Sequence, residues 1–273
     1  MLPLAGKVIY LGPGCGHVAY TLGFIGALLD DQQLREVLRS RGAVFGGTSS
    51  GAFAALYATA SLHDVHNMAW WYKHGMRPGY EAIERHGTTR VMGDKLESQS
   101  RHFYREVLAS QQGTEGTGDV IPWLQTLPVA MTEVGTLRPR FHSTFRSEDE
   151  LAQIITSSSY VPGLMGLAPW ATVNGSQLPV FDGYIGTWTA RWPDNYLFVS
   201  FLPTAPVHAK HHLRAYEYDS TAEALLTKAW PWGDPQWADR AFSRGEADAV
   251  AHRTELRAAL SAFLADVGEV SRA

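Results

Sequence analysis

The chain has 273 residues, of which 45% are hydrophobic and 18% are charged. This composition excludes disorder over most of the length and suits one large globular domain. The formal net charge is −4, and no lysine- or arginine-rich run is present. Since phosphate binding needs a clustered basic surface, these features argue against a nucleic-acid partner.

The N-terminal segment MLPLAGKVIYLGPG predicts a first strand and not a signal peptide. No basic segment precedes its short apolar stretch, and no small-residue cleavage site follows it. The chain also lacks an uninterrupted apolar run of about 18 residues, the length needed to span a bilayer. A single cysteine, Cys15, excludes an intramolecular disulfide and fits a reducing compartment. We therefore expect a cytoplasmic protein for which peripheral contact with a membrane stays open.

Short apolar runs that end in glycine alternate with segments of helical periodicity along the first 62 residues. Residues 8–11 (VIYL) form a β-branched run that stops at the loop GPGCG. Apolar residues recur at helical spacing over residues 18–38, interrupted by DDQQ, which predicts two helices joined at a corner. A second run at residues 43–45 ends in two glycines and precedes helical spacing over residues 52–62. This pattern predicts a strand, a tight turn and a helix.

The remaining chain continues the alternation of helices and short strands. Ser147 with Glu150 three residues later is a capping box, which predicts the start of a helix that ends near residue 158. The chain is therefore expected to be of the α/β class, with a mostly parallel or mixed central sheet. The other expected elements are helix and loop over residues 63–90, a helix over 94–108, a surface loop over 111–119, a hairpin of 129–133 with 140–144, strands at 178–183 and 196–202, and an amphipathic helix over 247–267.

The pentapeptide Gly47-Thr48-Ser49-Ser50-Gly51 fits the pattern G-x-S-x-G. A serine hydroxyl attacks an ester only if it stands on a strained turn, has a base nearby and meets donors for the oxyanion. Gly47 and Gly51 flank Ser49 at the two positions where side chains would collide as the backbone turns from strand to helix. A serine that merely caps the following helix is the alternative. The strand-turn-helix context favours Ser49 as a nucleophile.

The loop that contains Gly14, Cys15 and Gly16 predicts backbone donors for an oxyanion. Glycine-rich backbone between a strand and a helix turns N–H groups toward an anion. Residues 14–19 also fit the dinucleotide fingerprint G-x-G-x-x-G/A. That fingerprint needs an acidic residue at the end of a second strand about 20 residues later, whereas the acidic residues here follow or lie within a helix. The loop therefore favours anion stabilisation over a nucleotide cofactor.

The base that would activate Ser49 is the part that the residues alone determine least. A Ser-His-Asp hydrolase would take a late histidine, and a cluster of histidines is also compatible with zinc. No carboxylate stands at helical spacing from the His208, His211 and His212 group, which argues against zinc. The candidate histidines are His208, His211, His212 and His252.

The glycine loop, the G-x-S-x-G segment and Asp182-Gly183 at a strand end together resemble the patatin-like phospholipase family. Residues 155–164 (ITSSSYVPGL) look like the A-S-S-x-x-P-G-x-F segment of that family. The Gly-Cys-Gly loop and residues 245–249 are similar to the animal adiponutrin-type branch. The resemblance covers about residues 7–205.

This resemblance implies a three-layer α/β/α fold with a single domain over residues 1–273 and a C-terminal helical extension over 206–273. It also implies a lipid acyl hydrolase, of phospholipase or acylglycerol lipase type, that needs neither metal nor organic cofactor. The implied dyad is Ser49 as nucleophile and Asp182 as base. The implied site residues are completed by Gly14, Cys15 and Gly16 at the oxyanion and by Gly47, Gly51 and Gly183 in structural positions.

Three positions depart from the family pattern. Pro13 and Ala19 make the glycine loop atypical, and Tyr184 follows Asp182-Gly183 where a small residue is usual. Two other functions therefore stay open: an inactive patatin fold that binds lipid or acts as a scaffold, and an ordinary Ser-His-Asp α/β-hydrolase. The expected partner is a fatty-acyl ester, at a membrane or lipid-droplet surface. Residues 230–237 (WPWGDPQW) are the candidate interfacial or channel-mouth element, with a rigid surface loop as the alternative.

Overall fold

The described strands of the protein form one central sheet. The computed structural model describes residues 6–111, 122–162, 165, 169, 171, 173, 179–202, 208–218 and 234–266. The strand order is β4-β3-β2-β1-β6-β7, and β5 pairs with β3. The pairs among β3, β2, β1, β6 and β7 are parallel, whereas β4 and β5 run antiparallel to β3. The strands are β1 (Val8–Leu11), β2 (Val44–Thr48), β3 (Val129–Glu133), β4 (Pro139–His142), β5 (Val180–Phe181), β6 (Tyr196–Ser200) and β7 (His211–Arg214).

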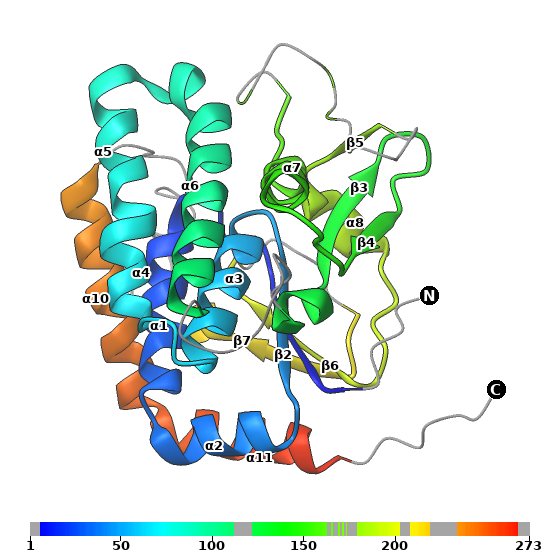
Figure 1. Cartoon of the computed structure of the whole chain (residues 1–273). Coiled ribbons are helices and arrows are strands. Elements are labelled where there is room, and N and C mark those ends of the chain that lie inside the picture. Colours follow the sequence, from blue (N-terminus) through cyan, green and yellow to red (C-terminus); the bar gives the residue numbers. More distant parts are fainter. Residues whose placement is uncertain are drawn as a thin grey trace.

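Helices cover this sheet unequally, as Figure 1 shows. The α-helices are α1 (Val18–Leu29), α2 (Gln32–Ser40), α3 (Ser50–Leu62), α4 (Met68–Trp71), α5 (Arg77–His86), α6 (Thr88–Gln111), α7 (Glu148–Ser158), α8 (Gly183–Thr189), α10 (Pro235–Ala251) and α11 (Arg253–Ala265). Shorter helical turns are η1 (Cys15–His17), the π-helical η2 (Tyr72–Met76), η3 (Pro122–Thr126) and η4 (Ala215–Glu217).

Alternation along the strands gives the sheet two apolar faces. Ile9 of β1 packs with α1, α3 and α7 in the main core, whereas Tyr10 packs on the opposite face. On that second face the aromatic ring of Trp192 lies 4.5 Å from the ring of Tyr10. Helix α8 packs on the same face, since Thr132 of β3 accepts a hydrogen bond from its Gly186 N–H. The result is a three-layer α/β/α arrangement with a thin third layer.

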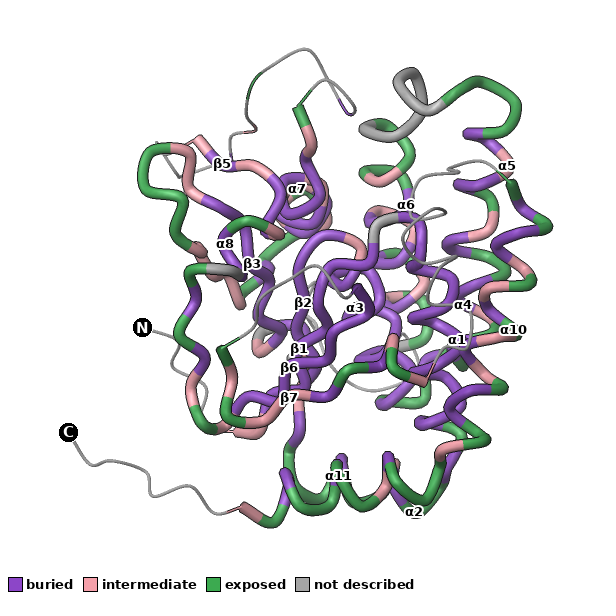
Figure 2. The backbone as a smooth tube through the Cα atoms, turned by 180° about the vertical axis from the view of Figure 1, so that it is seen from behind, coloured by how far each residue is buried: buried purple, intermediate pink, exposed green. Residues whose placement is uncertain are grey.

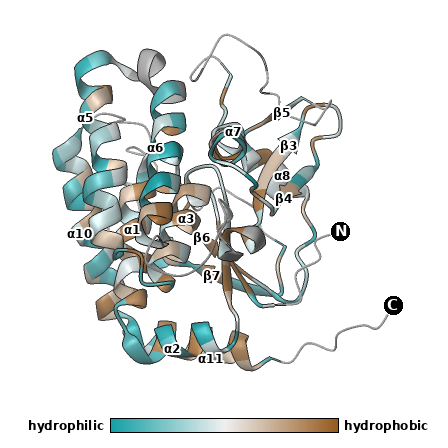
Figure 3. Ribbon diagram, viewed as in Figure 1, coloured by the Kyte–Doolittle hydropathy of each residue, from teal (hydrophilic) through white to brown (hydrophobic). Residues whose placement is uncertain are grey.

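Helix α3 lies at the centre of the main core. Its residues from Gly51 to Leu62 are all buried, because alanine, leucine and aromatic side chains occupy every side of the helix. Figure 2 shows α3 and the neighbouring strands as buried, whereas α2 and α11 alternate between buried and exposed segments. Figure 3 shows hydrophilic residues concentrated on the outer helices α5, α6 and α10. The turn that precedes α3 is therefore held by a rigid element.

Helices α1 and α10 cross at backbone contact. A Cβ atom at Gly23 would overlap the carbonyl oxygen of Phe242, and one at Gly245 would overlap the carbonyl oxygen of Tyr20. The hydroxyl of Tyr20 also donates to Asp248 at 3.1 Å. Glycine at both positions is therefore needed for this crossing, which joins the C-terminal part of the chain to the start of the fold.

The α/β class and the mostly parallel sheet predicted from the sequence are confirmed. The capping box is present in modified form: Ser147 Oγ accepts from the Glu150 N–H at 3.2 Å, while Glu150 accepts from the N–H of Arg146 at 2.8 Å. The expected loop over residues 111–119 lies, apart from residue 111, outside the described residues.

Two expectations for the C-terminal part need correction. Strand β7 lies within residues 206–273, so the sheet extends into the segment expected to be helical only. The single helix expected over residues 247–267 is two helices, α10 and α11, separated at His252. Trp237 of the suggested interfacial element is buried, with its ring 5.5 Å from His17, because α10 packs inward there; residues 230–233 lie outside the described part.

Candidate active site

Ser49 and Asp182 follow two strands whose carboxyl ends meet. Strand β2 runs parallel to β3 and pairs with it only as far as Thr48 and Ala130. Strand β5 runs antiparallel to β3 and pairs with Thr132 and Glu133. Because β4 occupies the other edge of β3, β5 continues along the same edge as β2 from the opposite direction. The residues immediately after these strands, Ser49 and Asp182, are thereby brought together.

Ser49 occupies a strained turn between β2 and α3. Its backbone has φ 56° and ψ −133°, a left-handed conformation that a residue other than glycine adopts at a cost of about 1–3 kcal/mol. A Cβ atom at Gly47 would overlap the carbonyl of Gly51, and one at Gly51 would overlap the carbonyls of Leu11 and Gly12. The two glycines that flank Ser49 therefore permit a close backbone approach that other residues would block.

Ser158, the last residue of α7, holds the backbone of this turn. Its buried hydroxyl accepts from the N–H of Ser49 at 3.0 Å and donates to the carbonyl of Ala130 at 2.6 Å. Both bonds are local to the junction of β2, β3 and α7. No sequence pattern indicated an individual role for this serine, since its only signal was its place in the ITSSSYVPGL segment.

Asp182 is fixed at its backbone and its carboxylate. Its main-chain carbonyl accepts from Thr132 Oγ1 at 2.7 Å, and its Oδ1 accepts from the N–H of Tyr184 at 2.7 Å. A Cβ atom at the next residue, Gly183, would overlap Thr48 Oγ1 and the carbonyl of Ala130. Glycine at this position therefore lets the segment pass directly beside the end of β2.

The protonation of Asp182 is set mainly by burial. Only 9% of the residue is exposed, and this desolvation raises the pKa of its carboxyl to about 6. Hydrogen bonding from the side chain of Ser49 and from the backbone of Tyr184 lowers the pKa, and so limits the rise. Asp182 can therefore exchange a proton near neutral pH and has the serine hydroxyl as a neighbour.

The glycine loop lies against the same turn. The N–H of Gly14 donates to Ser50 Oγ at 2.7 Å, and the carbonyl of Gly16 accepts from the buried hydroxyl of Tyr80 at 2.7 Å. The N–H of Gly14 is thus already engaged. The next two N–H groups along the loop belong to Cys15 and Gly16. These two donors stand at the start of η1, and Gly16 lines the cavity that contains Ser49.

An apolar cavity of about 610 Å³ opens over Ser49 and Asp182. It lies between α5 and α6 on one side and the end of α7, β5 and α8 on the other, the two groups that stand apart in Figure 1. A cavity of this size takes a small organic ligand or one long alkyl chain. Apolar lining residues include Phe53, Met76, Ile83, Leu96, Phe181 and Ile185.

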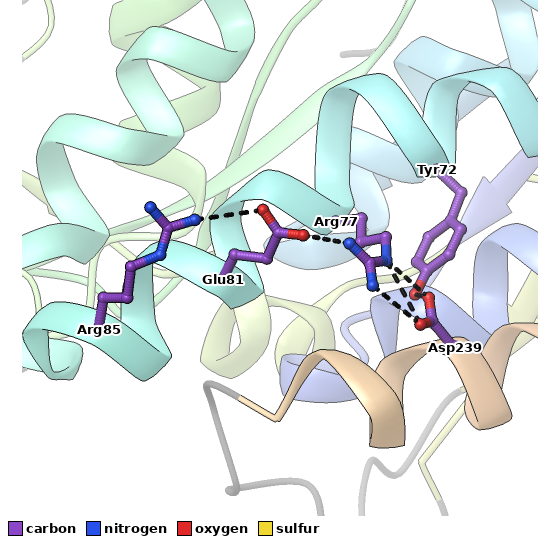
Figure 4. Close-up of polar contacts among 5 residues, drawn as sticks. All are labelled: Tyr72, Arg77, Glu81, Arg85 and Asp239. Carbon is purple, nitrogen blue, oxygen red and sulfur yellow. Dashed lines mark hydrogen bonds and ion pairs between the residues drawn. The ribbon is translucent and has the colours of Figure 1, made fainter.

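The α5 wall of the cavity is tied to α10 by the polar contacts in Figure 4. The guanidinium Nε of Arg77 lies 3.0 Å from Asp239, and the hydroxyl of Tyr72 donates to the same carboxylate at 2.7 Å. Glu81 pairs with Arg77 and, at 3.4 Å, with Arg85. Desolvation acts to raise the pKa of Asp239, but the hydrogen bonds from Arg77 and Tyr72 and the charge of Arg77 together hold that pKa below its usual value. This network fixes the helix that carries Tyr80.

No histidine belongs to the cavity lining that the structure describes. His211 and His212 lie on β7, where His212 hydrogen bonds to Ser200 at 2.7 Å and His211 to Asp266 at 2.9 Å. His252 contacts Glu255 at 3.3 Å, and His208 is exposed. Among the described residues, no group of three or more histidine, cysteine or acidic side chains is arranged to hold a metal ion. None of the described helices is both long and apolar enough to cross a membrane.

Comparison with known proteins gives matches among solved structures only. No family model matches the sequence, and no curated protein matches it. Six chains of known structure match, among them one in the heterodimeric ExoU–SpcU complex from the type III secretion system of Pseudomonas aeruginosa. That chain is 15% identical, with a TM-score of 0.41 over 92% of this chain. The protein spans about half of it, because the match covers 52% of its length.

Proposed function

We propose that the protein is a serine hydrolase that cleaves fatty-acyl esters, with Ser49 as nucleophile and Asp182 as base. The observation that carries this proposal is the strained turn of Ser49 beside a buried carboxyl group whose pKa is about 6. A nucleophile on a sharp strand-to-helix turn and a base poised near neutral pH are two of the three requirements for serine attack. The patatin-like resemblance of the sequence agrees with the same pair.

In the proposed reaction, Ser49 Oγ attacks the ester carbonyl carbon while its proton passes to the Asp182 carboxylate. The tetrahedral intermediate collapses, the bond to the alcohol oxygen breaks, and the proton of Asp182 passes to the departing alkoxide. The acyl group remains on Ser49 as an ester. Water then attacks this acyl-enzyme, with Asp182 accepting its proton and returning one to Ser49, so that a fatty acid is released.

The developing oxyanion needs donors beside Ser49, and the glycine loop supplies them in this proposal. We assign this role to the N–H groups of Cys15 and Gly16, because both residues stand at the start of η1 and Gly16 lines the cavity that contains Ser49. The N–H of Gly14 has a supporting role, because its bond to Ser50 fixes the loop against α3. Donors fixed before the reaction stabilise the intermediate without a cost for reorganisation.

The apolar cavity supports a fatty-acyl substrate, since burying an alkyl chain there lowers the free energy of binding in proportion to the apolar area removed from water. The same cavity also favours a second function, binding of a lipid without hydrolysis. A phosphonate probe that reacts covalently with activated serines discriminates the two. We expect a fluorophosphonate to label the wild type and not Ser49→Ala, and Ser49→Ala to lose hydrolysis of 4-nitrophenyl octanoate.

The folding of each variant is checked by circular dichroism, so that loss of activity is not confused with loss of structure. Replacement of Ser50, whose hydroxyl accepts from Gly14, is the neighbouring comparison: Ser50→Ala should keep part of the labelling. Labelling that persists in folded Ser49→Ala, or hydrolysis that does not depend on Ser49, contradicts the proposal. A wild type that binds 4-nitrophenyl octanoate without hydrolysing it supports the lipid-binding alternative.

A further inference from the structure

The cavity over Ser49 has a single basic side chain among its described lining residues, Lys95 of α6. Lys95 is exposed and stands between the apolar interior and solvent, beside Leu96 of the same wall. The acidic side chain of the lining is Asp182. An anion that enters such a cavity meets an apolar wall and a carboxyl group, so the lysine is the group that can offset its charge.

Lys95 differs from the arginines of the same helices in having no acidic partner within the described chain. Arg77 and Arg85 pair with Glu81, and Arg101 pairs with Glu97 at 2.8 Å. The acidic residues near Lys95 in the sequence, Asp94 and Glu97, line a separate surface hollow together with Arg101 and Arg105. Helix α6 therefore keeps its ion pairs on one face and an uncompensated cation on the cavity face.

The helical position where an acid would neutralise Lys95 holds an amide instead. Gln99 lies one turn further along α6, where a glutamate would pair with a lysine four residues before it. The residue is 8% exposed, and its Nε2 donates to the carbonyl of Met76 at 3.5 Å. Its Oε1 is buried and without a hydrogen-bond partner among the described residues. At Gln99 the cavity wall thus has an amide that can hydrogen bond but adds no negative charge.

We propose that Lys95 binds an anionic group on the alcohol part of the substrate. The preferred substrates are then acyl esters whose acyl chain enters the apolar cavity and whose alcohol carries a phosphate or carboxylate at its mouth. This inference rests on the proposed hydrolytic function and specifies the substrate class for the same site. Lys95 acts on selection of the substrate, and the chemistry stays with Ser49 and Asp182.

Two chromogenic esters with the same acyl chain test this selection. One is 4-nitrophenyl octanoate, which is neutral, and the other is 4-nitro-3-(octanoyloxy)benzoic acid, which carries a carboxylate on its alcohol part. The readout is the ratio of kcat/KM for the charged ester to that for the neutral one. We expect Lys95→Met to lower this ratio about fivefold and Lys95→Glu to lower it further, mainly through a higher KM for the charged ester. Both effects should become smaller at high salt, because salt screens the charge of the lysine.

Lys73→Glu makes the same change in net charge on an exposed lysine of η2 that does not line the cavity, and it should leave the ratio unchanged. A ratio that Lys95→Glu does not alter, or that Lys73→Glu alters equally, overturns the inference. If the ratio in Lys95→Glu equalled that of the wild type, Lys95 would be only a solvated surface residue.

Binding without catalysis separates this inference from the hydrolytic proposal. Decyl phosphate and decyl maltoside are titrated calorimetrically into Ser49→Ala and into Ser49→Ala with Lys95→Glu. We expect about tenfold weaker binding of decyl phosphate, relative to decyl maltoside, in the double variant. If the wild type hydrolyses neither ester but this difference is present, the anion site stands and the hydrolytic function fails. Inorganic phosphate that competes as strongly as decyl phosphate would identify a free-anion site and overturn the proposed substrate class.

Discussion

The N–H of Ser49 donates to the hydroxyl of Ser158 at 3.0 Å, across 109 residues of sequence. The same hydroxyl donates to the carbonyl of Ala130, so one side chain joins the turn before α3 to β3 and α7. A turn with a positive φ persists only where its surroundings hold it. Ser158 is therefore a positioning residue for Ser49 in the proposed mechanism.

Removal of this hydroxyl should loosen the turn. In Ser158→Ala the N–H of Ser49 and the carbonyl of Ala130 both lose a buried partner, which costs about 1–3 kcal/mol in the free energy of unfolding. We expect a lower kcat with a smaller change in KM, measured with 4-nitrophenyl octanoate. The neighbouring Ser159 has a buried hydroxyl without a partner among the described residues, so Ser159→Ala should cost less stability. Equal losses in the two variants would contradict this role of Ser158.

The pKa of Asp182 sets the pH dependence of activity. Since the carboxylate is the active form of a base, kcat/KM should fall about tenfold per pH unit below pH 6 and level off above it. Asp182→Asn should remove this limb together with most of the activity. The measurement is the pH profile of kcat/KM between pH 4.5 and pH 8.5, which brackets the pKa of about 6. A flat profile through pH 6 would exclude Asp182 as the base.

The same pKa makes a prediction for stability. The folded-state pKa of about 6 lies above the ordinary value of 3.8, so the protonated carboxyl favours the folded state. This contribution is fully present below pH 3.8 and is lost as the pH rises through 6. At pH 8 the asparagine variant should thus be more stable than the wild type by about 3 kcal/mol, since each pKa unit corresponds to about 1.4 kcal/mol. Urea unfolding at pH 4 and pH 8 checks this, and the gap should nearly close at pH 4.

The positive φ of Ser49 predicts a difference between two inactive variants. Alanine keeps the strain of the turn, whereas glycine adopts this conformation freely. Ser49→Gly should therefore be more stable than Ser49→Ala by about 1 kcal/mol, after the greater flexibility of glycine in the unfolded chain is taken into account. Thermal unfolding of both proteins gives the comparison. A less stable glycine variant would show that the turn carries no strain.

Gly183 and Gly135 form a matched pair for a test of the close approach beside Asp182. A Cβ atom at Gly183 would overlap Thr48 and Ala130, whereas one at Gly135 meets no atom within 4 Å. Gly183→Ala should lower the free energy of unfolding by about 1–3 kcal/mol and lower kcat, because Asp182 must shift away from Ser49. Gly135→Ala should change neither quantity appreciably. The idea fails if the two alanine variants unfold at the same urea concentration.

The sequence predicted the elements around Ser49 well because their signals are local. Residues 8–11 form β1 as expected, and the glycines at ±2 of Ser49 lie in the predicted strand-turn-helix. The strand that precedes Asp182 is weaker: in the structure β5 has two residues and is defined by its antiparallel pairing with β3. Such pairing depends on contacts about 50 residues apart, so the residues alone predicted a turn aspartate and the family resemblance was needed for its role.

Other contributors to the site carry no sequence signal of their own. Tyr80 reaches Gly16, and Thr132 reaches Asp182, through hydrogen bonds between distant segments. Lys95 is one lysine among ordinary helical residues until its helix is placed beside the cavity. The break between α10 and α11 at His252 was missed because apolar periodicity continues through it. Long-range packing, and not local preference, decides each of these positions.

The contact of α1 with α10 at Gly23 and Gly245 limits how the protein can be shortened. A fragment that ended before residue 235 would retain the motif-bearing segments but leave uncovered the side of α1 that contains Gly23 and the backbone of Tyr20. It would also remove Asp239, the partner of Arg77 on the helix that carries Tyr80. A truncation chosen from the motifs would thus aggregate or lose the shape of its cavity, whereas the two pieces expressed together have a surface on which to reassociate.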